Sequence, residues 1–442
     1  MASSFARLRP VYVVDGRRTP FLKAKGNRGA FSASDLAVEA GRQLLLTMPF
    51  SPEMLDEVII GSVFPDAKEA NIARVISLRL GCGKKVPAFT VNRNCASGMQ
   101  ALDCAAKDIA MGRAELVLAG GAEAMSRYPL LHTPEMVEWL VAWGKARGFG
   151  ARLAVLMKMR PAYLRPVLGV LQGLTDHVVG LNMGQTAEIL AHRFGISREE
   201  MDAFSVESHR RLAAATDGKL FAGELAPMID GAGNVYDFDD GQRRDSDMAK
   251  LAKLKPVFDP KLGKVTAGNS AQLTDGAAAL LLASGAAVKK HNLPVLGKLL
   301  DFEWAGVDPA QMGLGPVHAI AGILARNGLK AADIGNFEIN EAFATQVLAC
   351  LRAWNDADYM KKEIGDSAVG LGPLGMENIN IDGGGVSIGH PVGASGARIT
   401  LHLLKTLRRN GGRKGVASLC IGGGQGGAVL VENVERADES SI

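Results

Sequence analysis

The sequence predicts an α/β protein with two similar halves, each a largely parallel, buried sheet covered by helices. From residue 10 to residue 126, strand-like apolar runs alternate with helical stretches, and the same alternation returns after residue 288. Such alternation is typical of α/β domains. The region between the two arrays has a different composition. At 442 residues and 47% hydrophobic content, the chain is long enough for two or three domains.

The first array forms the first half. Its expected strands are 11–16, 56–63, 89–92 and 115–123, and its expected helices are 32–46, 71–81 and 96–106. The chain returns to this sheet through a glycine-rich turn and an apolar run that ends at residue 284. We therefore assign residues 1–126 and about 264–287 to the first half, and residues 127–263 to an inserted region.

The second array, 288–442, forms the second half. Its expected strands are 295–307, 336–340 and 416–432, and its expected helices are 319–328, 341–354 and the helix after His390. NCASGMQALDCAA and GHPVGASGARITLHLL each place a reactive residue before a small-residue turn that opens a helix. We interpret this as an internal duplication whose two helix starts meet at one site. Chance recurrence of such turns is the alternative.

Cys95 lies where a buried strand turns into a helix. Unpaired N–H groups and the helix dipole make such a point locally positive, so we expect a lowered pKa and a nucleophilic thiolate. The alternative is that Cys95 is a small buried core residue, as most free cysteines are.

Composition excludes several classes of protein. The five cysteines are irregularly spaced, without CxxC or neighbouring histidines, so neither a disulfide framework nor a zinc site is indicated. The net charge of +4 is too small to indicate nucleic acid binding. No apolar run reaches the roughly 18 residues of a membrane span, and the first strand begins too early for a secretory signal. We expect a cytoplasmic, reducing location.

Four motifs occur in one order: NCASGMQ at Cys95, NEAFA at Asn340, GGGVSIGHPVGASGAR at His390 and CIGGGQGG at Cys420. Together with MGQTAE and VTAGN, they resemble the thiolase family over nearly the whole chain. The resemblance implies a thiolase fold: two βαβαβαββ halves in a layered α-β-α-β-α core, with an inserted loop domain that contributes to coenzyme A binding.

The resemblance also implies catalytic roles. Cys95 matches the nucleophile that accepts the acyl group. His390 matches the base that deprotonates this thiol, a task suited to imidazole. Cys420 matches the acid/base at the α-carbon of acetyl-CoA. Asn340 matches the residue that fixes an oxyanion-hole water beside His390, and the N–H groups of Cys95 and Gly422 would form the second oxyanion hole.

Coenzyme A is a substrate in this family, and the resemblance implies no metal, flavin or nicotinamide. Its pantetheine would pass Met183, Ala267 and Gly268. The sequence departs from the common pattern at Ala271, where many thiolases carry serine, and at Asn182, where several carry histidine. These departures weaken the case for short-chain biosynthetic specificity.

An additional segment, 356–380, and a long middle region look like the β-subunits of fatty-acid oxidation complexes, although those often carry His-Glu where this chain has Asn340-Glu341. We therefore expect a degradative 3-ketoacyl-CoA thiolase. The alternatives are an acetoacetyl-CoA thiolase, a carrier-protein synthase, and a non-catalytic acyl-CoA-binding or lipid-binding protein that retains the fold.

Residues 127–180 hold seven basic residues and three acidic ones, and no acid lies between Trp139 and Thr175. The basic residues alternate with aromatic and aliphatic ones. Three interpretations stay open for 139–175: helices packed on their own protein, docking on a hydratase/dehydrogenase α-subunit, and contact with a membrane surface. We also expect a homodimer or a dimer of dimers.

Overall fold

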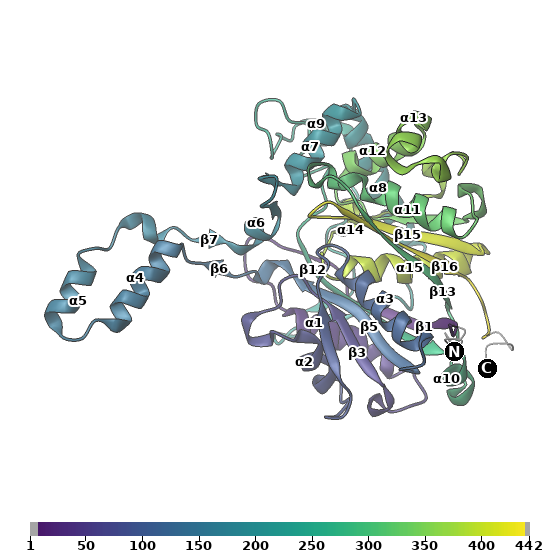
Figure 1. The fold of residues 1–442 in the computed structure, drawn as a ribbon, viewed down its shortest axis with the longest axis horizontal. Coiled ribbons are helices and arrows are strands. Elements are labelled where there is room, and N and C mark those ends of the chain that lie inside the picture. Colours follow the sequence, from purple (N-terminus) through teal and green to yellow (C-terminus); the bar gives the residue numbers. More distant parts are fainter. Residues whose placement is uncertain (1–7, 438–442) are drawn as a thin grey trace, which may run out of the picture.

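One long sheet runs through the body of the molecule (Figure 1). The computed structural model describes residues 8–437 and joins the strands in the order β14-β15-β16-β13-β1-β12-β5-β3-β4, with β2 paired to β12. The first-half strands are β1 (Val11–Arg18), β2 (Leu22–Lys23), β3 (Glu57–Gly61), β4 (Ala88–Val91), β5 (Leu116–Ala124) and β12 (Thr274–Ser284). The second-half strands are β13 (Gly297–Gly306), β14 (Asn336–Ile339), β15 (Lys414–Ile421) and β16 (Gln425–Glu432).

The strand order confirms two similar halves. Counted outward from β1, the first half pairs β12 and β5 antiparallel, then β3 and β4 parallel. Counted outward from β13, the second half pairs β16 and β15 antiparallel, then β14 parallel. A short antiparallel ladder between β1 and β13, including Val11 opposite Leu299, joins the two halves.

The second half lacks the outermost strand of its βαβαβαββ pattern. At the place equivalent to β4 there is only a single parallel bridge between Phe337 and Ile379. A 3₁₀ turn, Met376–Asn378, precedes this bridge, and Asn380 follows it in the left-handed region with φ of +47°. Extended backbone therefore cannot continue on either side of Ile379.

Helices form three layers around the two halves of the sheet. The central layer is α3 (Ser97–Ala110) and α15 (Ser395–Asn410), whose buried side chains share one apolar cluster with both halves of the sheet. The outer helices of the first half, α1 (Ala33–Leu45) and α2 (Ile72–Arg79), pack in a second cluster, and α11 (Gly315–Arg326) and α12 (Ala344–Trp354) pack in a third. The result is the α-β-α-β-α layering predicted from the motifs.

The inserted region covers one end of this core. Its main helices are α7 (Met183–Arg193) and α8 (Arg198–Asp217), and a short helix, α9 (Met248–Ala252), contacts α8. The Ser197 side chain accepts from the Glu200 N–H while Glu200 accepts from the Ser197 N–H, which is the helix opening predicted there. Asn182 likewise caps α7 by accepting from the Gln185 N–H at 2.9 Å.

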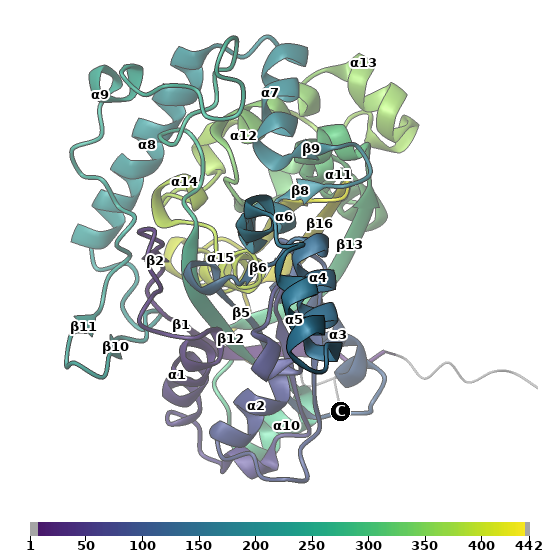
Figure 2. The ribbon, with the colours of Figure 1, turned by 90° about the vertical axis from the view of Figure 1, so that its left-hand side faces the viewer.

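A helical arm projects from the body in Figure 1, and in Figure 2, where that side faces the viewer, its helices lie in front of the body. Its stem is the two-residue ladder of β6 (Leu130–Leu131) and β7 (Val167–Leu168), and its helices are α4 (Pro134–Lys145) and α5 (Phe149–Leu156). Neither helix contains a buried residue. Within the single chain, this helix pair therefore does not pack on the body of its own protein. No helix among residues 8–437 is both long and apolar enough to cross a bilayer.

Candidate active site

A tight turn between β4 and α3 presents Cys95. Asn94 takes a left-handed φ of +45°, a conformation that asparagine tolerates better than most residues. The Ser97 hydroxyl accepts from the Arg93 N–H at 2.9 Å and donates to the Asn94 carbonyl at 2.7 Å. The Asn94 amide donates to the Gly422 carbonyl at 2.7 Å, so the Cys95 turn of the first half is directly joined to the glycine turn after Cys420 in the second half.

Burial raises the pKa of Cys95 to about 11. The N–H groups of Gly422 and of Cys95 itself lower this pKa, and the nearby Glu123 carboxylate raises it. The expected lowering of the Cys95 pKa by the helix start was wrong. Burial destabilises the thiolate by more than the two N–H groups stabilise it, so the pKa rises. Those two N–H groups are the donors assigned to an oxyanion hole, and their effect on the thiol means that they face its sulfur.

His390 lies in the turn that opens α15, directly after Gly389, whose φ is +109°. Its Nδ1 is 2.6 Å from the Ser395 hydroxyl, and that hydroxyl donates to the Pro391 carbonyl. Since the one hydroxyl proton is used there, Ser395 accepts from Nδ1–H, which leaves the lone pair on Nε2. Burial, with a contribution from Arg398, lowers the pKa of His390 to about 3, so its ring is neutral.

Asn340 comes directly after β14 and meets the His390 ring. Its amide nitrogen is 3.4 Å from each ring nitrogen, and its backbone N–H donates to the Ser418 carbonyl at 2.9 Å. The Asn340 side chain is fully buried. The structure therefore brings together two of the predicted residues that lie 50 positions apart in the chain.

Glu341 fixes the loop that carries these residues. Its carboxylate accepts from the Ser208 hydroxyl at 2.7 Å, the Asn380 amide at 2.9 Å and the Val386 N–H at 3.2 Å. A Cβ on Gly384 would collide with this carboxylate. Glu341 thus connects α8 to the turn before His390, a role that explains a buried acid next to Asn340.

Cys420 is buried near the end of β15, two residues before Gly422. Its pKa is raised well above that of an ordinary thiol, first by burial and then by the proximity of Cys95 and Cys350. Cys420 and Cys95, 325 positions apart in the sequence, are therefore close enough to affect each other's ionisation.

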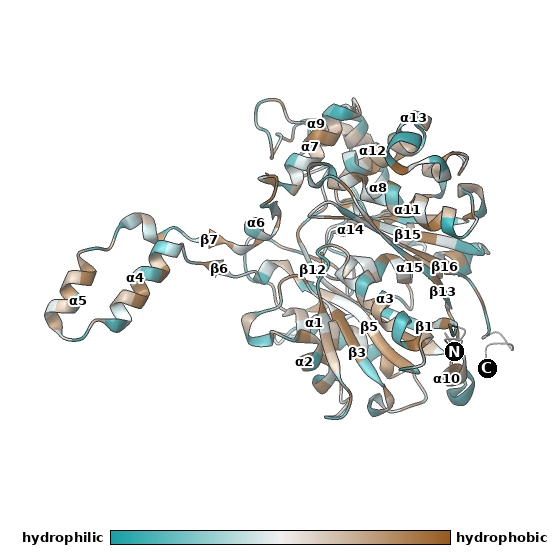
Figure 3. Ribbon diagram, viewed as in Figure 1, coloured by the Kyte–Doolittle hydropathy of each residue, from teal (hydrophilic) through white to brown (hydrophobic). Residues whose placement is uncertain are grey.

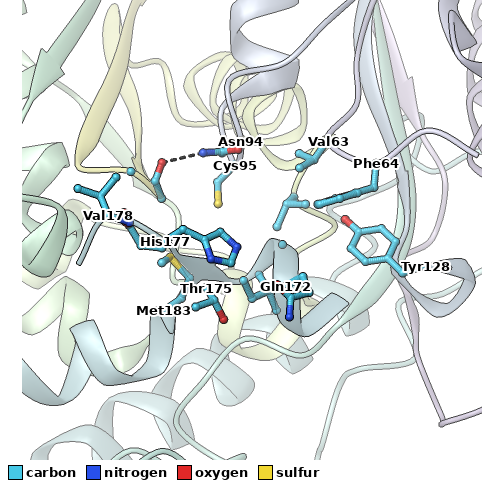
Figure 4. A pocket seen from close by; sticks show the side chains of 16 residues that line it. Val63, Phe64, Asn94, Cys95, Tyr128, Gln172, Thr175, His177, Val178 and Met183 are labelled. Atoms are coloured by element: carbon cyan, nitrogen blue, oxygen red, sulfur yellow. Dashed lines mark hydrogen bonds between the residues drawn. The ribbon is translucent and has the colours of Figure 1, made fainter. Parts of the chain in front are cut away.

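An open cavity of about 430 Å³ lies in front of Cys95 (Figure 4). Met183, predicted to contact pantetheine, is in its wall, whereas Ala267 and Gly268 are not, and His390, Asn340 and Cys420 do not line it either. The lining residues are Val63, Phe64, Asn94, Cys95, Tyr128, 172–178, Met183, Val392, Gly422 and Gly423.

Two residues of this site were not predicted from the sequence. His177 lies in the cavity wall, and Figure 4 shows its ring projecting into the cavity below the Cys95 sulfur. Glu123 lies fully buried at the end of β5 and accepts from the N–H groups of Val63 at 2.8 Å and Phe64 at 3.2 Å. A lone acid inside the apolar and glycine run LVLAGGAEA was the signal for Glu123. The segment around His177 contains no comparable signal.

The geometry suits covalent acyl transfer. A partly buried thiol faces two backbone N–H donors at a cavity large enough for a small acyl group. A second thiol, Cys420, lies close enough to affect its ionisation, and the turn that carries the neutral His390 ring contributes Val392 to the cavity wall. Among residues 8–437 no cluster of three or more His, Cys, Asp or Glu side chains could hold a metal ion.

Comparison with known proteins agrees with this arrangement. Residues 11–286 match the thiolase N-terminal domain, and residues 293–433 match the thiolase C-terminal domain. The human mitochondrial 3-ketoacyl-CoA thiolase is 39% identical over 432 residues, covering 97% of this chain and 99% of that protein. A 3-ketoacyl-CoA thiolase of Yersinia pestis is 36% identical and covers 96% of each chain.

Solved structures give the same result. The human mitochondrial 3-ketoacyl-CoA thiolase in complex with CoA has a TM-score of 0.82 at 37% identity, covering 98% of this chain and all of that one. The Bacillus anthracis acetyl-CoA acetyltransferase also has a TM-score of 0.82, at 34% identity, covering 97% of this chain and all of that one. Two domain matches that together span most of the chain, and relatives this similar along nearly their whole length, place the protein: it belongs to the thiolase family.

Proposed function

We propose that the protein is a 3-ketoacyl-CoA thiolase that transfers an acyl group from a 3-ketoacyl-CoA to coenzyme A through a thioester on Cys95. The observation that carries the proposal is the Cys95 sulfur facing the N–H groups of Cys95 and Gly422 at an open cavity. These donors are placed to stabilise the negative oxygen of a tetrahedral intermediate. The names of the human and Yersinia pestis relatives support the substrate class.

In the first half-reaction, His390 Nε2 removes the Cys95 proton as the sulfur attacks the 3-keto carbon. The bond between C2 and C3 then breaks, and Cys420 protonates the acetyl-CoA enolate that leaves. In the second half-reaction, Cys420, now a thiolate, takes the proton of the coenzyme A thiol as its sulfur attacks the acyl-Cys95 thioester. His390 returns its proton to the leaving Cys95 sulfur, and an acyl-CoA shortened by two carbons is released. The backbone N–H groups of Cys95 and Gly422 stabilise one oxyanion of the reaction. Asn340 and the His390 ring stabilise the other. Pantetheine passes Met183, with Ala267 and Gly268 farther along its path.

The pKa values of Cys95 and His390 indicate how the proton moves in the first step. A thiol with a pKa of about 11 does not give its proton to an imidazole with a pKa of about 3 before attack begins. Proton transfer and carbon–sulfur bond formation therefore occur together, as general-base catalysis rather than through a preformed ion pair.

A chain-length series of 3-ketoacyl-CoAs with coenzyme A tests the reaction, with loss of the enolate absorbance as the readout. Cys95→Ser should abolish turnover, whereas Cys104→Ser, a matched half-buried cysteine on α3, should not. Cys420→Ser should still acylate Cys95 from acetyl-CoA but lose α-proton exchange, and His390→Ala should lose both. Full activity in a Cys95→Ala variant would refute the proposal.

The same series separates the second candidate, an acetoacetyl-CoA thiolase, which the similarity to the Bacillus anthracis acetyl-CoA acetyltransferase supports. Activity confined to the four-carbon substrate would favour that function. Turnover that extends to longer chains would favour degradative cleavage.

We also propose a cytoplasmic homodimer. The support for dimerisation is β4, the last strand at one end of the sheet, whose four residues are all partly exposed and whose outer edge pairs with no other strand among the described residues. Such an edge is a pairing surface for a second copy. Sedimentation equilibrium should give twice the 46.6 kDa chain mass, and a monomer would contradict the proposal.

A further inference from the structure

The arm, residues 132–166, is predominantly positively charged. Its two acids, Glu135 and Glu138, lie in the first turns of α4 near the stem. All six basic side chains are exposed, and none forms an ion pair with any residue that the structure describes. They are Lys145, Arg147, Arg152, Lys158, Arg160 and Arg165.

The arm is also rich in apolar residues, which colour both helices brown in Figure 3, and many of their side chains are exposed. Phe149 is 83% exposed and Met157 is 80% exposed. The other exposed large apolar side chains of the arm are Val137, Leu140, Val141, Leu153, Leu156 and Leu164. A soluble protein does not leave a contiguous apolar surface bare without an interaction partner.

Inside the hairpin, the Trp139 indole N–H already has a hydrogen-bond partner. The Trp139 and Trp143 rings stack at 5.5 Å, and the Trp139 indole N–H donates to the Val155 carbonyl at 2.9 Å. The Arg152 guanidinium lies 5.9 Å from the Trp143 ring centre. The Trp139 indole N–H and the helical backbone N–H groups form hydrogen bonds within the hairpin. The hairpin can therefore enter an apolar environment without leaving these donors unpaired.

We propose that the arm docks the enzyme on an anionic lipid surface. The helices α4 and α5, of 12 and 8 residues, are far shorter than the roughly 20 residues of a bilayer span, so the hairpin would lie in the interface. Apolar side chains enter the acyl boundary, tryptophans occupy the headgroup level, and the basic side chains meet lipid phosphates.

A lipid surface accounts for these features better than a protein partner does. A protein interface typically pairs charges of both signs. Here every charge beyond the first turns of α4 is positive. The exposed apolar side chains follow one face of each helix, at 137, 140 and 141 and at 149, 153, 156 and 157, as in an amphipathic helix that lies in a membrane interface. Charge complementarity therefore favours an anionic surface, to which the arm can bind without a specific alignment of side chains.

Docking would also set the position of the active-site cavity. The chain leaves the arm through β7 and α6 (Gly169–Gly173) and then forms the cavity wall at 172–178. The rim of the cavity is thus held at the base of the arm. Docking goes beyond the proposed reaction and does not depend on it, although fatty acyl substrates would gain from a cavity held near lipid.

Co-sedimentation with vesicles tests the proposal, using phosphatidylcholine alone and phosphatidylcholine mixed with phosphatidylserine, at low and high salt. The full-length protein should bind only the anionic vesicles, and binding should fall at high salt. Arg147/Lys158/Arg160→Glu should weaken binding by at least about 100-fold, since each cation near such a surface contributes about fivefold. This variant leaves the Arg152–Trp143 contact intact.

Two further variants complete the design. Lys84/Lys85/Lys289→Glu reverses three exposed charges on the body, two between α2 and β4 and one in helix α10 (Gly285–His291), and should bind like the wild type. Phe149/Leu153/Met157→Ser keeps every charge and should also lose binding. Circular dichroism and thiolysis activity verify that each variant is folded.

Three outcomes would overturn lipid docking. The first is no binding of the wild type to anionic vesicles at low salt, which would assign the arm to a protein partner. The second is equal binding by the charge-reversed arm variant. The third is equal loss in the body variant, which would show a response to total charge rather than to the arm.

Discussion

Cys95 and His390 have pKa values displaced in directions that keep both groups neutral. Burial raises the pKa of the thiol to about 11 and lowers that of the imidazole to about 3. An enzyme that holds its nucleophile as a thiol avoids alkylation and oxidation between turnovers, because the thiolate is the reactive form. The reactivity of Cys95 must therefore arise when substrate is bound.

We predict that iodoacetamide reacts with Cys95 in the free enzyme at a rate that rises about tenfold per pH unit from pH 7 to pH 9, because the thiolate fraction rises by that factor far below the pKa. Mass spectrometry of the Cys95 peptide gives the rate. A plateau at or below pH 8 would mean that the thiol is already ionised there.

Glu123 offers a second test at the same scale. Its charge raises the pKa of Cys95, so Glu123→Gln should move the alkylation profile of Cys95 to lower pH. Because Glu123 also holds the N–H groups of Val63 and Phe64 in the cavity wall, KM should rise.

The matched control is Asp275→Asn, a buried carboxylate that accepts from Ser126 instead. It should leave the Cys95 profile unchanged. An unaltered profile in Glu123→Gln would show that this carboxylate does not influence the thiol.

The sequence predicted that Asn340 lies against His390, but not the ionisation of the groups in the site. Cys95, Asn340 and His390 could be found because their motifs are long and specific, and the structure places Asn340 against His390. The sign of the Cys95 shift could not be found, because it depends on how much water the folded chain removes from the sulfur. His177 enters the site through tertiary folding of a segment that carries no motif.

At the scale of elements, the central helices α3 and α15 cross where side chains are smallest. A Cβ on Gly98 would lie 2.8 Å from the Gly393 carbonyl, and one on Gly396 would lie 2.6 Å from the Met99 nitrogen. A Cβ on Gly121, in β5, would overlap the Gly393 carbonyl outright. The backbone of the His390 turn therefore rests directly on the first half of the molecule.

We predict that Gly121→Ala displaces this turn, lowers kcat by at least about tenfold and destabilises the protein by about 1–3 kcal/mol, the usual cost of overpacking. Steady-state thiolysis and urea unfolding measure the two effects. The control is Gly144→Ala in the exposed helix α4, where nothing lies within 4 Å of the added Cβ. It should be neutral or slightly stabilising. Normal turnover by Gly121→Ala would show that the turn tolerates displacement.

Elements with regularly spaced apolar residues were predicted well, and elements whose form depends on tertiary contacts were not. The runs at β1, β3, β5 and α1 could be recognised from apolar spacing alone. The absence of a strand at Ile379 could not be predicted in this way, because it results from the turns on either side of that residue. The arm was recognised by its composition, but its projection from the body depends on the absence of any surface that covers it.

At the scale of the molecule, a buried ionic network connects β1, the inserted region and α15. The His402 ring is 2.9 Å from Glu224 and 3.1 Å from Asp382, and Glu224 also accepts from Arg18. Burial opposes the charge on His402, but Glu224 and Asp382 outweigh it and raise its pKa to about 10.

We predict that His402→Gln lowers the free energy of unfolding by about 3–5 kcal/mol at neutral pH, because it leaves buried carboxylates without their cation. The folded pKa lies above the unfolded value of about 6.5. The stabilisation is therefore complete below pH 6.5 and is lost as pH rises toward 10.

Urea unfolding at pH 6, 8 and 9.5 measures this difference, with His192→Gln on the exposed face of α7 as the control. A difference between His402→Gln and wild type that grows with pH would contradict the assignment of a buried imidazolium.

The central helical layer has a consequence for the origin of the site. Because α3 and α15 share one apolar cluster, a polypeptide with only one half could cover its central helix only with a second copy of itself. In that symmetric pair, both helices would begin with the same reactive side chain. Joining the two copies in one chain frees the two helix starts to diverge: here Cys95 lies two residues before α3, and His390 lies five residues before α15. The division of labour between Cys95 and His390 is thus a difference between halves that two identical chains could not encode.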